Sequence, residues 1–181
     1  SQPRIRAIAS DEEALWIGTY EDGLVRYTPR TGAYENIRAS TQANTLSSDS
    51  IRTLLVDTEG VLWVGHDSRG VDRYLGDGEF ASFRYQPENR HSVAGDHVAS
   101  LFQDASGVLW VGTVQGVSRW NTRAAAFTNY NQSSGDARLT RNSIGGGPLR
   151  EVHDVDRGFA FFDQIDHRGL EGFFAVCEVE R

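Results

Sequence analysis

The chain has 181 residues and a net charge of −7; 24% of its residues are charged and 39% are hydrophobic. An acidic chain is unsuited to a nucleic-acid backbone or an anionic membrane surface, because both are negatively charged themselves. Its one cysteine, Cys177, excludes an internal disulfide framework and a cysteine-rich metal site. No run approaches the ~20 apolar residues that a membrane-spanning helix needs.

A six-residue string occurs three times along the chain. Its copies are residues 14–19 (Ala-Leu-Trp-Ile-Gly-Thr), 61–66 (Val-Leu-Trp-Val-Gly-His) and 108–113 (Val-Leu-Trp-Val-Gly-Thr). The tryptophan of each copy lies 47 residues after the previous one. A fixed period of this length is typical of a repeat architecture.

Three further runs flank each copy of this string. An apolar run ending in aspartate precedes it, a Gly-Leu/Val-x-Arg-aromatic run follows it, and another apolar run closes the unit. These runs are residues 5–11, 23–27 and 34–37, then 51–57, 70–74 and 80–85, then 98–104, 116–120 and 127–130. Because the runs are short, β-branched and bounded by glycine, they predict four strands per unit. Four strands per ~40–50 residues are typical of a β-propeller blade.

The residues that recur in every unit are predicted to be structural. We expect the tryptophans to fill the space between stacked sheets and the aspartates to form turns. These residues are Trp16, Trp63 and Trp110, and Asp11, Asp57 and Asp104.

The repeated string resembles the two-component regulator propeller repeat. It reads Asp-x-x-Gly-x-Leu-Trp-Val-Gly-Thr-x-x-Gly-Val-x-Arg-aromatic, and the resemblance covers about residues 5–144, with connectors at 44–51 and 139–144. The resemblance implies a periplasmic role, in the sensor region of membrane-bound bacterial hybrid histidine kinases or diguanylate cyclases. It also implies polysaccharide fragments or other small molecules as signals.

The expected fold is all-β, with propeller blades of four antiparallel strands. We expect three repeats within residues 1–144, at about 5–50, 51–97 and 98–143, followed by a remainder at 145–181. A propeller typically closes with four to eight blades. Three units and a remainder therefore predict either a closed ring of four blades or an incomplete ring. An incomplete ring would be a fragment of a longer propeller or would close by dimerisation. The absence of methionine and of a fourth motif favours a portion of something larger.

The remainder departs from the repeat. The fourth tryptophan should fall at position 157, which is an arginine, and Gly145-Gly146-Gly147-Pro148 stands where an inner strand belongs. Two strand-like runs, 158–162 and 173–179, follow. Three interpretations stay open: a diverged fourth blade, sequence foreign to the repeat such as a truncated or frame-shifted end, and a separate functional element.

Non-repeating polar residues are the better functional candidates, because packing does not require them. In a propeller, the loops after the second strand and the loops between blades reach one face around the central channel. The candidate ligand-binding residues there are Tyr20, Asp22, Asp49, His66, Asp67, Arg69, Asp96, His97 and Gln115. His66 departs most sharply, because the sister repeats have threonine; its alternative interpretation is a solvated loop histidine. We expect no metal site, since His91 and His97 lack metal-ligand spacing.

The favoured function is a non-enzymatic sensory or ligand-binding propeller segment of a bacterial signal-transduction receptor. We expect no enzyme and no cofactor, because no nucleophile elbow, zinc-protease motif or phosphate loop is present. The expected partners are a small-molecule or oligosaccharide signal, the rest of the receptor propeller, its membrane-bound output domains and a second copy in a homodimer. The alternatives are a propeller-fold lyase or hydrolase with a channel-face site, and a purely structural dimerisation module.

Overall fold

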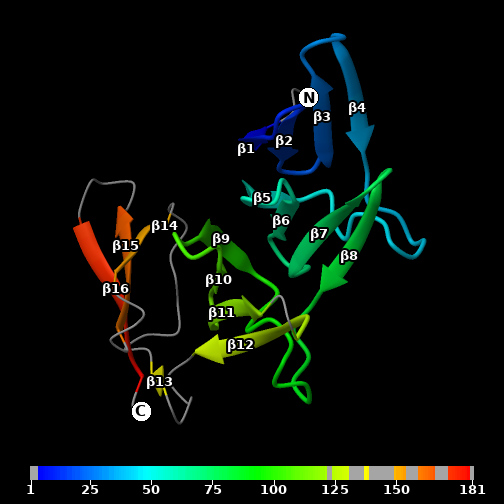
Figure 1. The fold of residues 1–181 in the computed structure, drawn as a ribbon. Helices are drawn as coiled ribbons and strands as arrows, with labels where there is room; N and C mark the ends of the chain where they lie inside the picture. The colour runs from blue at the N-terminus through cyan, green and yellow to red at the C-terminus, as the bar shows by residue number, and fades with distance from the viewer. Residues whose placement is uncertain are drawn as a thin grey trace. The chain divides into compact units, whose positions relative to one another are not determined.

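The computed structural model describes residues 4–121, 124–130, 137–138, 149–153, 159–165 and 171–179. Three four-stranded antiparallel sheets follow one another, each with its strands in chain order (Figure 1). The first sheet contains β1 (Ile5–Ser10), β2 (Leu15–Thr19), β3 (Leu24–Thr28) and β4 (Ala33–Ile37). The second contains β5 (Ile51–Val56), β6 (Leu62–His66), β7 (Val71–Gly76) and β8 (Glu79–Phe83). The third contains β9 (Val98–Gln103), β10 (Leu109–Thr113), β11 (Gly116–Asn121) and β12 (Ala126–Tyr130). The predicted all-β fold of four-stranded blades is confirmed.

A fourth sheet follows with a different strand order. It contains β13 (Ala137–Arg138), β14 (Leu149–His153), β15 (Phe159–Ile165) and β16 (Glu171–Val179), ordered β13-β16-β15-β14. The two strand-like runs predicted in the remainder overlap β15 and β16. The glycine run at 145–148 and Arg157 lie outside the described residues.

The chain divides into two compact units. One consists of Ser1–Arg84 with Asp96–Val98 and holds the first two sheets. The other consists of Tyr85–Gly95 with Ala99–Arg181 and holds the fourth sheet and nearly all of the third.

The core of the first unit lies between its two sheets. Trp16 of the first sheet packs edge-on against Tyr74 of the second, with the ring centroids 5.1 Å apart. The backbone of the first sheet also lies close to Ile51 of the second sheet at Gly18. Glycine is needed there, because a Cβ added at Gly18 would lie 2.5 Å from Cγ2 of Ile51. The other buried members of this core are Ala14, Leu24, Ile37, Leu46, Ile51, Leu62, Val64 and Phe80.

The recurring aspartates and tryptophans form one structural device. In the first repeat, Asp11 Oδ1 accepts hydrogen bonds from the amides of Glu13 (2.8 Å) and Ala14 (2.7 Å), which closes the β1–β2 turn. Asp11 Oδ2 accepts the indole N–H of Trp16 at 2.7 Å. The equivalent indole bonds, to Asp57 and Asp104, are both 2.8 Å. Turn formation and tryptophan burial were predicted; the indole bond that joins them was not.

We expect Asp104→Asn to destabilise the protein in a pH-dependent way. Burial alone would raise the pKa of the Asp104 carboxyl, but hydrogen bonds from Ser106, Trp110 and the Val108 amide lower it below the ordinary value of 3.8. A carboxyl with a depressed folded pKa stabilises the fold above its unfolded pKa, and this contribution is lost as the pH falls through the folded value.

Urea unfolding at pH 7 and pH 3 tests this expectation. Asp104→Asn should lower the free energy of unfolding by about 1 kcal/mol at pH 7, and its difference from the wild type should shrink at pH 3. Glu88→Gln, at an exposed position, is the control with the same charge change. An equal loss for Asp104→Asn at both pH values would contradict the assignment.

One face of the first sheet is uncovered. Tyr34 is 79% exposed, whereas Phe80 and Phe127, at the equivalent positions of the next two repeats, are 1% exposed. Ile5 is 57% exposed, whereas its counterpart Ile51 is fully buried. The first sheet therefore presents to solvent an apolar face whose counterparts in the later repeats are covered.

Candidate ligand-binding face

The hairpin loops after the second strands and the connectors between sheets gather at one end of the first unit. The amide of Gly23, in the β2–β3 loop, donates to the carbonyl of Asp49 at 3.1 Å. The amide of Gly70, in the β6–β7 loop, donates to the carbonyl of Asp96 at 2.9 Å. Each connector is thus tied to the hairpin of the preceding sheet, and the polar side chains of both segments share this end.

Two of the candidate residues, Tyr20 and Asp67, are joined by arginines that were not predicted. Asp67 Oδ2 accepts from Arg6 Nη1 at 2.5 Å, and Asp67 Oδ1 accepts from Arg52 Nη1 at 3.1 Å. The Arg6 and Arg4 guanidinium carbons lie 4.3 Å and 5.1 Å from the centroid of the Tyr20 ring. We call Arg4, Arg6, Tyr20, Arg52 and Asp67 the arginine cluster.

Two β-bulges direct the side chains of Arg6 and Arg52. In the β1–β2 pair, Ile5 faces Thr19 but Ala7 faces Gly18, so Arg6 is an extra residue on its strand. The β5–β6 pair has the same irregularity at Arg52, between residues 51 and 53. A bulge re-aims a side chain that regular pairing would send elsewhere, and bulges are frequent beside functional sites. The sequence signal was an arginine at the second position of a largely apolar strand in two of three repeats.

The arginine cluster is a positive spot on an acidic chain. The cluster contains three guanidiniums and one carboxylate, which Arg6 and Arg52 share, so its net charge is +2, while the whole chain carries −7. The side chains of Arg6, Arg52 and Asp67 are 28%, 29% and 23% exposed, so solvent and small solutes reach them.

Asp22 and Asp49 are brought together by a fourth arginine. Arg38 donates to Asp22 Oδ1 at 3.0 Å and to Asp49 Oδ2 at 3.3 Å, and Asp49 Oδ1 accepts the Ala39 amide at 2.8 Å. The hydrogen bonds to Asp22 and Asp49 raise the pKa of the Arg38 guanidinium. This arrangement fastens the segment after β4 to the hairpin loop, which is a structural task.

His66 is not the loop residue that both interpretations from the sequence assumed, and it is not solvated. It is the last residue of β6 and is fully buried. Its Nε2 lies 2.9 Å from Oδ2 of Asp72, which is also fully buried. Asp72 additionally accepts the amide and the hydroxyl of Ser47, both at 2.7 Å. The third repeat has Thr113 and Ser118 at these two positions, so both departures from the repeat belong to one buried pair.

The remaining candidates do not enter the arginine cluster. Arg69 is exposed on the β6–β7 loop, and Asp96 and His97 lie in the connector before β9. Gln115 belongs to the second unit, where its Oε1 occupies the space that a Cβ at Gly95 would take. Within the described part of the chain, no three His, Cys, Asp or Glu side chains are placed to hold a metal ion. The same residues include no helix long and apolar enough to cross a membrane.

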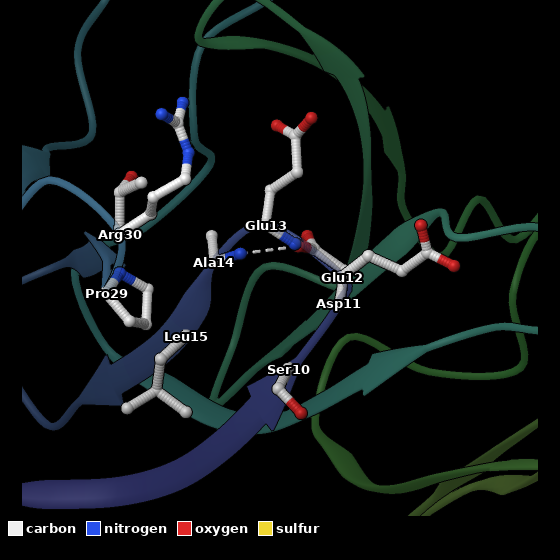
Figure 2. Close-up of a pocket in the computed structure, with 9 residues that line it drawn as sticks. Ser10, Asp11, Glu12, Glu13, Ala14, Leu15, Pro29 and Arg30 are labelled. Atoms are coloured by element: carbon white, nitrogen blue, oxygen red, sulfur yellow. Dashed lines mark hydrogen bonds between the residues drawn. The ribbon is translucent and has the colours of Figure 1, made fainter.

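An acidic groove lies at the opposite end of the first sheet. Residues 10–15 and 28–30 line a cavity of about 470 Å³, shown in Figure 2 with the hydrogen bond that ties Asp11 to Ala14 in its wall. Asp11 is committed to the turn and to Trp16, and Glu13 pairs with Arg26 at 3.6 Å. These carboxylates therefore serve the turn and the strand beside it, and we assign no ligand to the groove.

Comparison with known proteins identifies the repeats. Residues 45–68 and 92–115 match the two component regulator propeller family, so the chain carries repeats of that family. No curated protein matches the sequence.

Among the solved structures that resemble this fold, three illustrate the likeness. The extracellular domain of the hybrid two component system BT3049 from B. thetaiotaomicron matches all of this chain, with a TM-score of 0.75 and 18% identity. A computationally designed protein, Ika4, matches with a TM-score of 0.59 and 13% identity over 97% of this chain and 93% of its own. Virginiamycin B lyase from Staphylococcus aureus matches with a TM-score of 0.59 and 10% identity over 94% of this chain and 55% of its own. The chain spans a quarter of the BT3049 domain, and these likenesses establish the propeller fold.

Proposed function

We propose that this chain is a ligand-binding, non-enzymatic segment of a periplasmic sensor propeller in a bacterial two-component system. The repeats of the two component regulator family and the likeness to the BT3049 extracellular domain support this role. A rigid set of blades holds loops whose side chains converge, and a ligand bound there shifts an equilibrium between two arrangements of the whole receptor. The transmitted signal then passes to a membrane-bound output domain.

The arginine cluster is the observation that carries the binding role. Its side chains lie at the loop end of the first unit, remain accessible, and are not required by the sheet-to-sheet core. Tyr20 adds an aromatic ring beside them. Proteins use accessible arginine and aromatic side chains that lie close together to bind and orient polar ligands.

The uncovered face of the first sheet supports a place in a larger propeller. Its exposed residues occupy positions that are buried in the next two repeats, which indicates that a neighbouring blade normally covers them. We therefore propose that the rest of the receptor propeller is the partner of this face.

A thermal-shift screen with neutral and acidic oligosaccharides tests the binding role. A ligand at 100 times its Kd should stabilise the protein by about 2.7 kcal/mol and raise the Tm. Tyr20→Ala should abolish the shift, and Tyr34→Ala, at an exposed tyrosine outside the cluster, should preserve it. Chemical turnover of the bound ligand would favour the lyase or hydrolase alternative. No shift across the panel, together with concentration-dependent dimerisation, would favour the structural alternative and overturn the proposal.

A further inference from the structure

We infer that the arginine cluster binds a carboxylate group of the ligand between the guanidiniums of Arg6 and Arg52. This inference rests on the proposed binding role of the same face and specifies the chemistry that the face recognises. Three observations support it: the unused donors of the two arginines, the excess positive charge of the cluster, and the way in which the Asp67 carboxylate contacts both guanidiniums.

The two arginines have donors to spare. A guanidinium carries five N–H groups in a planar fork. Arg6 and Arg52 each contact Asp67 through Nη1, and the contacts of the described residues leave Nη2 and Nε of both free for a second acceptor. Nearly 30% of each side chain is exposed, so part of each arginine is open to an incoming anion without rearrangement of the core.

The charge balance favours a second anion. Asp67 neutralises one of the three guanidiniums, and the remaining like charges repel one another across a partly desolvated site. Arg6 and Arg52 come from different sheets, and the bulge at each position directs both side chains toward the same carboxylate.

Asp67 also shows which anion fits. Its two oxygens reach one guanidinium each, Oδ2 toward Arg6 and Oδ1 toward Arg52. A planar carboxylate therefore spans the gap between the arginines. Charge-assisted hydrogen bonds of this kind are about twice as strong as neutral ones.

The experiment compares glucose, glucuronate and glucose 6-sulfate as probes of the full 181-residue chain. Chemical-shift titration should show binding of glucuronate and none of glucose at the same concentration. Arg6→Gln and Arg52→Gln should each weaken glucuronate binding about 10-fold, the factor that corresponds to 1.4 kcal/mol. Arg30→Gln makes the same charge change on the exposed β3–β4 turn at the other end of the sheet and should leave binding unchanged. Binding should weaken as salt rises, because salt screens the attraction.

Asp67→Asn separates a binding site from a merely structural cluster. The substitution removes the internal competitor and keeps the side-chain size, so glucuronate should bind more tightly than to the wild type. Unchanged or weaker binding in Asp67→Asn would overturn the inference, even if the arginine variants fold poorly. Equal binding of glucose and glucuronate would overturn it while leaving the proposed function intact. Binding of glucose 6-sulfate alone would assign the site to a tetrahedral anion and refute the carboxylate.

Discussion

Replacing Trp16 with alanine is expected to lower the free energy of unfolding by about 3–5 kcal/mol, the cost of deleting a large aromatic side chain from a core. Trp16 is 1% exposed and lies at the centre of the core between the first two sheets. The substitution removes its edge contact with Tyr74 and leaves the Asp11 carboxylate without its indole partner. Equilibrium urea unfolding followed by circular dichroism measures the loss.

Trp16→Phe is the matched control. Phenylalanine keeps most of the buried ring but has no indole N–H, so its loss should be smaller than that of alanine and include about 1 kcal/mol for the missing hydrogen bond to Asp11. A loss below about 1 kcal/mol for Trp16→Ala would contradict the packing of the two sheets, because no well-packed core tolerates a cavity of that size.

The buried pair of His66 and Asp72 should give the second large effect. Asp72→Ser removes the carboxylate that accepts from His66 and twice from Ser47, and should cost about 3 kcal/mol, since removing one partner of a buried pair strands the other. His66→Thr alone should also destabilise, because it opens a cavity and takes a donor from Asp72. The double variant, His66→Thr with Asp72→Ser, installs the combination found in the third repeat.

A double-mutant cycle in urea measures this coupling. We expect the double variant to recover about 1–3 kcal/mol relative to the sum of the two single losses, the range found for residues in direct contact. Asp72→Ser combined with Thr128→Ala, an exposed residue of the other compact unit, should be additive. Additivity in the His66 and Asp72 cycle would show that the two residues do not act as a pair.

The blades were predictable because the sequence contains three copies of the same pattern. Four short glycine-bounded runs per period predicted four strands, and the constancy of Trp16 and Asp11 across the repeats predicted packing and turn roles. The indole bond between them could not be predicted from type alone, because either residue has several possible partners. The order of the fourth sheet was also beyond local patterns, since β13 pairs with β16 across more than 30 intervening residues.

The candidate site was predicted less well, for two physical reasons. A departure from the repeat, such as His66, marks either function or compensation, and only a check of its hydrogen-bond partner, Asp72 where the third repeat has Ser118, distinguishes them. The arginine cluster was missed because a single bulge residue breaks strand alternation. Arg6 therefore falls in a run that reads as buried, although its side chain is directed toward Asp67.

The uncovered face of the first sheet has a consequence for how repeat proteins of this kind change in length. The first sheet covers one face of the second and leaves its own other face in need of cover, so insertion of a further 47-residue unit would create as much apolar cover as it consumes. Duplication of one unit can therefore lengthen the array without redesign of any existing core.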